Sequence, residues 1–322
     1  MKHMHIIASV LPVAILTTGI VASGHLPITP ADFSVSRAFA AVFSYVGKIP
    51  VVNTPGLALG AYDPHGDFKT LAGMKIEHAF LPWQDVDFSS LTDADGYASA
   101  RGRELLLTIE PWSWSKEWRL TPAQLQQAIA AGEYDPNIAA VCGAVGQLKS
   151  KVTVRWAHEM EDKTGQFTWS NWAPKDYIAA YRKFVRQCRD AAPNATFMWS
   201  PKGGSDMNDY YPGDEYVDSV GLSVFGLQQY DRDQVGHDRT FTEILEPGYK
   251  LAAIHGKPIV VAELGYAGDD GYVKQWAASV TQPLPDFPLL TSVVYFNDHE
   301  VYPWPNPYGL PDWRVVEEKT TM

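Results

Sequence analysis

Eight short apolar runs, separated by longer amphipathic stretches, follow one another along the chain from about residue 50 onward. Most of these runs are rich in β-branched or aromatic residues, and short uninterrupted apolar runs are typical of parallel strands that are buried on both faces. The predicted strands cover residues 57–62, 76–83, 105–110, 152–158, 196–199, 219–225, 259–263 and 292–296.

The stretches between these runs show helical periodicity. In 174–192 apolar residues recur one and three positions apart, which defines one face of a helix, and Pro174 suits its first turn. Residues 137–149 repeat the pattern. Eight alternations of strand and helix predict an α/β fold, a (β/α)8 TIM barrel forming a single catalytic domain over 50–322. A doubly wound open sheet is the alternative, but it usually carries a glycine-rich phosphate turn after an early strand, and none is seen.

The N-terminus has the layout of a signal peptide. Lys2 precedes an apolar run from 6 to 22, which softens into small residues. We expect 1–24 to be a signal peptide or an uncleaved signal anchor, because a run of 17 residues is marginal for a membrane span. Residues 25–49 are interpreted as a leader or N-terminal wrap. The protein is therefore expected to be exported, periplasmic or secreted, with membrane contact only if the anchor is retained.

Charge and composition narrow the class of ligand. The net charge of -11 argues against nucleic acid and against an anionic membrane surface as partners. The 11 Trp and 16 Tyr fit stacking on sugar rings, although core packing accounts for many of them. The pair His158-Glu159 begins like a zinc-protease motif, but position 162 is Asp rather than His. We predict neither a metal nor a cofactor.

The chain has two cysteines, Cys142 and Cys188, each on an apolar helical stripe. An exported chain allows them to pair. Two buried free thiols are the alternative, and the sequence leaves both open because it does not give their separation.

Charged side chains stand at the ends of two predicted strands. The active site of a barrel forms at the carboxyl ends of its strands. The fourth strand delivers Arg155, His158 and Glu159 there, and the seventh delivers Glu263. A lone Glu at a strand end is usually a rim or salt-bridge residue, but two lie across the mouth from each other here. Retaining glycoside hydrolysis needs this pair, so we assign Glu159 as acid/base and Glu263 as nucleophile.

Three segments resemble glycoside hydrolase family 26. They are residues 154–160, VRWAHEM, residues 211–221, YPGDEYVDSVG, and residues 257–265, KPIVVAELG. The resemblance covers about residues 55–300. The family includes β-mannanases, mixed-linkage β-glucanases and β-1,3-xylanases, and it implies a barrel with its two catalytic glutamates after strands four and seven.

Two departures from the family pattern concern the surroundings of these glutamates. The family usually has Asn-Gly where this chain has Glu161-Asp162, which adds negative charge near Glu159. The family often has a Tyr after strand six that hydrogen-bonds the nucleophile, and the matching position here is Phe225.

The strand-end segments also suggest residues that contact the substrate. The predicted substrate-binding residues are Arg155, His158, Glu110, Trp112, Trp169, Trp172, Phe225, Tyr266 and Tyr295. The resemblance implies a retaining endo-β-glycanase acting on a β-1,4-containing polysaccharide, either mixed-linkage β-glucan or β-mannan. Glucan is placed first because Glu110-Pro111-Trp112-Ser113 resembles the glucanase-like members. The alternatives are a catalytically weak barrel that binds polysaccharide and assists its synthesis or export, and a zinc hydrolase that chelation would inactivate.

Overall fold

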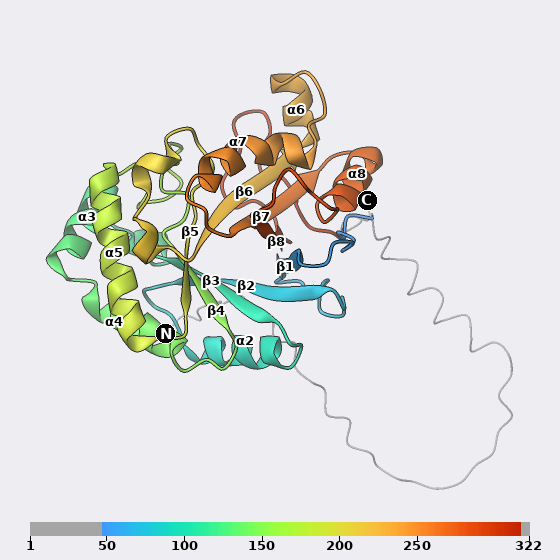
Figure 1. Ribbon diagram of the computed structural model, residues 1–322. Helices are drawn as coiled ribbons and strands as arrows, with labels where there is room; N and C mark the ends of the chain where they lie inside the picture. The colour runs from blue at the N-terminus through green and yellow to red at the C-terminus, as the bar shows by residue number, and fades with distance from the viewer. Residues whose placement is uncertain (1–46, 317–322) are drawn as a thin grey trace, which may run out of the picture.

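Eight parallel strands close into a barrel in sequence order, β1 through β8 (Figure 1). The computed structural model describes residues 47–316. The strands are β1 Ala58–Tyr62, β2 Met74–Pro82, β3 Glu104–Glu110, β4 Val152–Trp156, β5 Thr196–Trp199, β6 Ser219–Leu227, β7 Ile259–Ala267 and β8 Leu290–Phe296. All eight predicted strands are present, so the predicted (β/α)8 barrel is confirmed. The predicted signal segment 1–24 and most of the leader 25–49 lie outside the described residues.

Helices pack around the barrel and interleave with its strands (Figure 1). The α-helices are α2 Ser89–Ser99, α3 Pro122–Ala131, α4 Asp135–Val145, α5 Pro174–Ala191, α6 Gln228–Gln234, α7 Phe241–Ala253 and α8 Asp270–Ser279, and the short 3-10 helices are η2 Lys116–Trp118, η3 Met207–Tyr210 and η4 Asp214–Tyr216. Within the described part of the chain, β1 and β2 are joined by turns alone. None of these helices is both long and apolar enough to cross a membrane.

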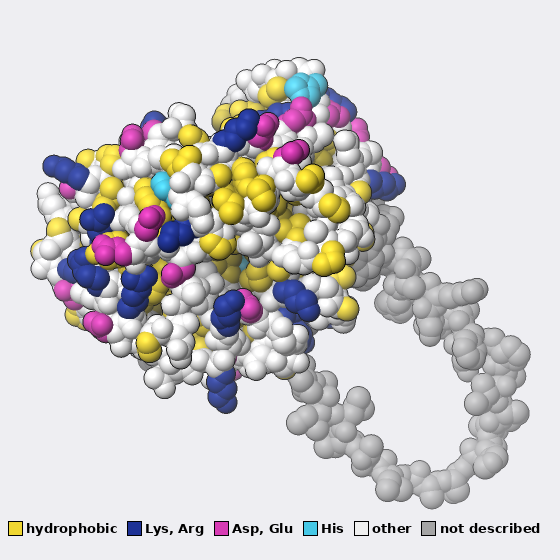
Figure 2. All heavy atoms as spheres, in the orientation of Figure 1, with side chains coloured by type: hydrophobic (Ala, Val, Ile, Leu, Met, Phe, Trp, Pro, Cys, Tyr) yellow, Lys and Arg dark blue, Asp and Glu magenta, His cyan; other side chains and the backbone are white. Residues whose placement is uncertain are grey.

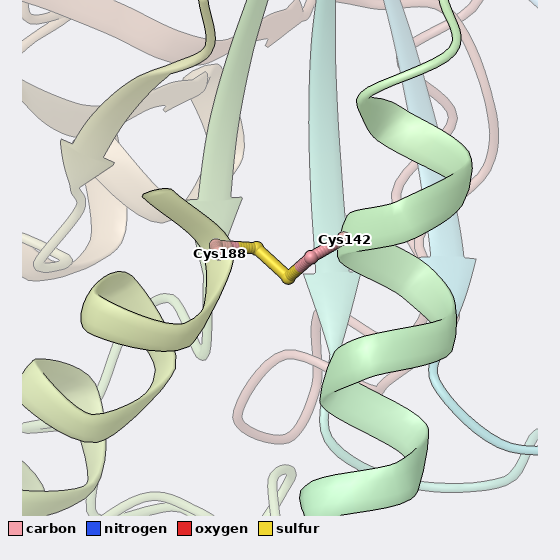
Figure 3. The surroundings of a disulfide bond; sticks show 2 residues. All are labelled: Cys142 and Cys188. Atoms are coloured by element: carbon pink, nitrogen blue, oxygen red, sulfur yellow. A yellow bond between two sulfur atoms is a disulfide. The ribbon is translucent and has the colours of Figure 1, made fainter. Parts of the chain in front are cut away.

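Helices α4 and α5 are joined by a disulfide between Cys142 and Cys188, whose Cα atoms lie 4.9 Å apart (Figure 3). Of the two alternatives that the sequence left open, the structure shows the paired form. Helix α4 runs from Asp135 to Val145 rather than over 137–149. Gly146 follows it at a point where a Cβ atom would collide with the carbonyl oxygen of Ala191 at the end of α5. The close approach of the two helices therefore requires glycine there.

The barrel interior changes from apolar to polar toward the carboxyl ends of the strands. A separate apolar cluster of Leu106, Met198, Val260, Ala262 and Val294 comes from the inward faces of β3, β5, β7 and β8. Farther along the strands, the same inward faces carry polar side chains. Side chains alternate between the two faces of a strand, and the register irregularity of β7 between Val261 and Leu264 allows the adjacent Ala262 and Glu263 both to face inward, so polar groups line the interior below the mouth.

Two strand ends differ from the prediction in a way that shapes the site. Strand β4 ends at Trp156, before His158, because Ala157 and Glu159 both have left-handed backbone, with φ of 47° and 53°. Strand β7 continues past Glu263 to Ala267. One predicted catalytic glutamate therefore lies within a strand, and the other lies in the turn that follows one. On the face shown in Figure 2, acidic and basic side chains are intermixed over the surface.

Candidate active site

A cavity of about 360 Å³ lies at the carboxyl-terminal mouth of the barrel, walled by the segments that follow β4, β5, β6 and β8. Glu159 and Glu263 both line it, together with His158 and Phe225. The other lining residues are Phe80, Thr164, Gln166, Phe167, Lys202, Tyr230, Phe296, Glu300, Val301, Tyr302, Pro303, Trp304 and Pro305. The structure thus brings the two predicted catalytic glutamates to one cavity.

Glu263 is a buried carboxylate held by a buried arginine. Its side chain points into the barrel from β7, and Arg155 Nη1 donates to its Oε1 over 2.6 Å. Burial raises the pKa of Glu263 to about 7, and the charge of Glu159 acts in the same direction. Arg155 opposes both because its positive charge favours the ionised carboxylate.

Arg155 is itself fixed by neighbouring strands. Its Nε donates to the hydroxyl of Ser200 over 2.8 Å, and its Nη1 donates to the hydroxyl of Thr108 over 3.2 Å. The side chain is fully buried. This arrangement answers the question raised by Phe225, which lacks the hydroxyl that often bonds the nucleophile in the resembling family. Here Arg155 donates the hydrogen bond to Glu263, while the ring of Phe225 lines the cavity.

His158 lies on the same side of the cavity, with Nε2 4.0 Å from Oε1 of Glu263. Burial, reinforced by the positive charge of Arg155, lowers the pKa of His158 well below its ordinary value. The imidazole is therefore neutral near pH 7 and interacts with Glu263 as a dipole rather than as a cation.

Glu159 is held differently, by loop geometry and hydroxyl contacts. Its N–H donates to the carbonyl of Ser200 over 2.8 Å, and Ser223 Oγ donates to its Oε1 over 2.5 Å. Left-handed backbone at a residue with a side chain costs about 1–3 kcal/mol. The surrounding hydrogen bonds keep the turn in place, and its effect is to aim the carboxyl into the cavity.

The two acidic residues after Met160 have different partners. Glu161 accepts hydrogen bonds from the N–H groups of Gly203 and Gly204 at 2.9 and 3.1 Å. Asp162 accepts a hydrogen bond from Lys202 Nζ over 2.8 Å. Burial lowers the pKa of Lys202, but the negative charges of Glu159 and Asp162 outweigh this effect, and the pKa is raised overall. Lys202, which sequence reasoning missed, therefore offsets the negative charge that this departure introduces.

Four predicted binding residues lie behind the cavity instead of lining it. Glu110 accepts from the indoles of Trp112 and Trp114 at 3.0 and 2.7 Å. Trp169 is fully buried, and its indole donates to the carbonyl of His158 over 2.7 Å. Trp172 is also buried and donates to the carbonyl of Thr168. Of the four, Trp169 supports the turn that carries Glu159, and none of them lines the cavity.

Tyr266 and Tyr295 point away from the barrel interior, contrary to the prediction that they contact substrate. Both are fully buried, and their hydroxyls donate to the carbonyls of Lys48 and Trp313. Since Glu263 faces inward, Tyr266 three positions later must face outward. This alternation can be read from the sequence, and on β8 it indicates Phe296 rather than Tyr295 as the inward-facing residue.

The largest group of missed residues follows β8. Residues 300–305 contribute Glu300, Tyr302 and Trp304 to the cavity, and Tyr230 of α6 lies 5.4 Å from Trp304 between ring centroids. The sequence signal was available, because this short segment combines a carboxylate with aromatic residues and prolines directly after a barrel strand.

The fold and the site together define a (β/α)8 barrel with one glutamate after β4 and another on β7, facing a common cavity. The model of the family described as "Glycosyl hydrolase family 26" matches residues 131–258, which include Glu159 and the sixth strand. This part of the chain is therefore similar to glycosyl hydrolase family 26.

Curated relatives share limited identity with this chain. A β-1,3-xylanase from Alcaligenes sp is 26% identical over 144 residues, covering 42% of this chain and 28% of the relative. Endoglucanase H from Acetivibrio thermocellus is 23% identical over 256 residues, covering 74% of this chain and 26% of the relative. The matched region thus spans about a quarter of the length of these relatives.

Solved structures support the fold. A Cellulomonas fimi endo-β-1,4-mannanase double mutant superposes with a TM-score of 0.60 at 16% identity, covering 80% of this chain and 68% of that one. A family 26 β-mannanase from Bacteroides ovatus gives a TM-score of 0.55 at 18% identity, covering 75% of this chain and 80% of that one. At these identities the likeness concerns the barrel itself.

Proposed function

We propose that the protein is a retaining endo-β-glycanase, with Glu263 as nucleophile and Glu159 as acid/base. One observation carries the proposal: carboxylates delivered by β4 and β7 line the same cavity at the carboxyl-terminal mouth of the barrel. Retaining glycoside hydrolysis uses two carboxyl groups that flank the scissile bond. The family relationship favours the same chemistry.

In the first step Glu263 attacks the anomeric carbon while Glu159 gives its proton to the leaving glycosidic oxygen. Arg155 donates a hydrogen bond to Glu263 and favours its ionised form, which suits the nucleophile, and in the proposed mechanism the transferred proton comes from Glu159. The products are a glycosyl ester on Glu263, a released sugar hydroxyl and an ionised Glu159.

In the second step Glu159 acts as base. It takes a proton from water, whose oxygen attacks the anomeric carbon and displaces the Glu263 carboxylate. The hydroxyl of Ser223 can donate to Glu159 while that residue is ionised. Two displacements on the same carbon retain the β-configuration, and both residues return to their starting protonation states.

For the substrate we propose a β-1,4-containing glucan or mannan, with mixed-linkage glucan first. Relatives whose names specify endoglucanase and β-mannanase activity support this range, whereas the β-1,3-xylanase name points to a different polymer. One argument for glucan is lost, because Glu110 and Trp112 lie behind the cavity. The second argument for glucan, Phe225 in place of the family's tyrosine, remains because the ring of Phe225 lines the cavity where sugar would bind.

Reducing-sugar release by the purified chain should be assayed on mixed-linkage β-glucan, glucomannan, galactomannan and β-1,3-xylan. Preference for glucan would support the proposal, and clear preference for galactomannan would overturn the glucan choice while keeping the mechanism. Absence of hydrolysis on every polymer, with retained binding, would instead favour the polysaccharide-binding barrel.

We also propose that the protein is exported. The disulfide between Cys142 and Cys188 supports this, because such bonds persist in oxidising compartments and are rare in the cytosol. Cell fractionation tests it directly, and recovery of the chain only in the cytosolic fraction would contradict it.

A further inference from the structure

A third carboxylate, outside the catalytic pair, lines the cavity. Glu300 follows β8 by four residues, and its carboxylate lines the cavity together with those of Glu159 and Glu263. We propose that Glu300 is a specificity-determining residue that accepts a hydrogen bond from a hydroxyl of a neutral sugar next to the scissile bond and disfavours sugars bearing a carboxylate or sulfate there. This inference deepens the proposed glycanase function and rests on it.

The carboxylate of Glu300 is held in place before any ligand arrives. Its Oε1 accepts from the N–H groups of Val301 and Tyr302 at 3.0 and 3.4 Å. Its Oε2 accepts from the indole of Trp313 over 3.4 Å. A carboxylate has about four acceptor sites, so these contacts fix the group and leave capacity for one more donor. A sugar hydroxyl at that position would form a charge-assisted hydrogen bond.

The charges around the cavity favour a neutral ligand. Among the described residues that line it, three are carboxylates, Glu159, Glu263 and Glu300, and the single lysine is Lys202. That lysine already bonds Asp162 over 2.8 Å. An anionic substituent beside Glu300 would meet like charge in a partly buried site, where charge interactions are stronger than in water. Glu300, in the segment that follows β8, therefore disfavours binding of an anionic sugar.

Aromatic rings around Glu300 restrict where a sugar can lie. Trp313, which donates to Glu300, lies 5.0 Å from Phe225 and 5.5 Å from Trp304 between ring centroids. Phe225 and Trp304 both line the cavity. Apolar sugar faces pack on such rings, while hydroxyls project from the ring edge. A sugar placed against these rings would direct an edge hydroxyl toward Glu300.

The test measures binding and hydrolysis together. Wild type, Glu300→Gln, Glu300→Asp and the control Glu104→Gln are titrated with a neutral β-1,4-gluco-oligosaccharide and with the same oligosaccharide oxidised to carboxylates at its 6-hydroxyls. Glu104 is half-exposed and pairs with Lys151 at the opposite mouth of the barrel, so its substitution should change neither affinity. Initial rates on mixed-linkage glucan and its oxidised form are measured in parallel.

We expect Glu300→Gln to lower affinity for the neutral ligand roughly tenfold, the size of one hydrogen bond to a charged group. The same variant should bind the oxidised ligand better than wild type does. Glu300→Asp keeps the charge but withdraws the oxygens, so it should lose neutral affinity and still reject the oxidised ligand. Melting temperatures confirm that each variant is folded, and if Glu300→Gln does not fold, the Asp variant still decides the outcome.

Affinities of both Glu300 variants that match wild type for both ligands would overturn the inference, even if wild type hydrolyses glucan. Wild type that binds with the expected preference but hydrolyses neither polymer would overturn the proposed function and support the role of Glu300 in recognition. The two failures are therefore distinguishable.

Discussion

The two glutamates that we propose as catalytic residues occupy contrasting surroundings. Glu263 lies within β7, and a fully buried arginine from β4 holds its carboxylate. Glu159 stands in a left-handed turn beyond β4, where Ser223 and the backbone of Ser200 are its partners. The first is fixed by sheet hydrogen bonds and an opposite charge, and the second by a turn with neutral partners.

This difference matches the two proposed roles, Glu263 as nucleophile and Glu159 as acid/base. A nucleophile must stay ionised and in line with the anomeric carbon, which favours a rigid strand and a cation. An acid/base must gain and lose a proton in each cycle, and a fixed cation in direct contact would oppose its protonation. If substitutions at or near the two glutamates had the same kinetic effects, this contrast would be wrong. Different effects, as predicted below, would support it.

The largest effect is expected from Glu263→Ala. Loss of the nucleophile should lower kcat on polymer by roughly 10⁴-fold or more, because the covalent step has no substitute. Added azide should restore part of the turnover and yield an α-glycosyl azide, identified by NMR. Near-wild-type activity in this variant would disprove the assignment, and release of α-anomer first by wild type would indicate an inverting reaction.

Glu159→Ala should be less severe and should depend on the leaving group. Hydrolysis of polymer should fall by about 10²–10⁴-fold, the usual contribution of general acid–base catalysis. Formation of the glycosyl-enzyme from an aryl glycoside with a good leaving group should be much less affected, because that oxygen needs no proton. Stopped-flow burst measurements on both substrates test this, and equal losses would argue against an acid/base role.

Arg155→Met should alter the pH profile. The nucleophile must be ionised, so kcat/KM should fall as pH drops through the pKa of Glu263, about 7. Arg155 lowers that pKa, so its removal should move the acid limb to higher pH and reduce kcat/KM about ten- to hundredfold at neutral pH.

Arg103→Met is the matched control, because Arg103 is also buried and pairs with Glu77 over 2.8 Å away from the cavity. It should destabilise the protein without moving the acid limb. An unchanged limb in Arg155→Met would show that Arg155 does not set the ionisation of Glu263.

The smallest effect on KM is expected from Trp169→Ala, which is compared with Trp304→Ala. Trp169 is fully buried, so its removal should cost about 3–5 kcal/mol of unfolding free energy. KM on polymer should barely change. Trp304 is half-buried and lines the cavity, so its removal should raise KM with little change in melting temperature. The reverse pattern would restore the original interpretation of Trp169 as a sugar-stacking residue.

Several parts of the site were predictable because they depend on local pattern. The apolar runs indicated eight strands, and strand ends indicated Arg155, His158, Glu159 and Glu263. The tryptophans after β3 and β4 were predicted to contact substrate but do not line the cavity, because aromatic content does not indicate whether a ring faces a cavity or the core. Trp169 went to the core, where its indole could satisfy the carbonyl of His158.

The sequence by itself determined the barrel, through the alternation of apolar runs and amphipathic helices, and the pair of glutamates, through their positions at strand ends. These features follow from hydrophobic periodicity, which is local and survives without knowledge of distant contacts. Only the tertiary structure decided which groups surround them. Arg155 reaches Glu263 across 108 positions and Ser223 reaches Glu159 across 64, because barrel closure brings separate strands together. Lys202 and Glu300 join the cavity for the same reason, and no local pattern encodes contacts between segments so far apart in the chain.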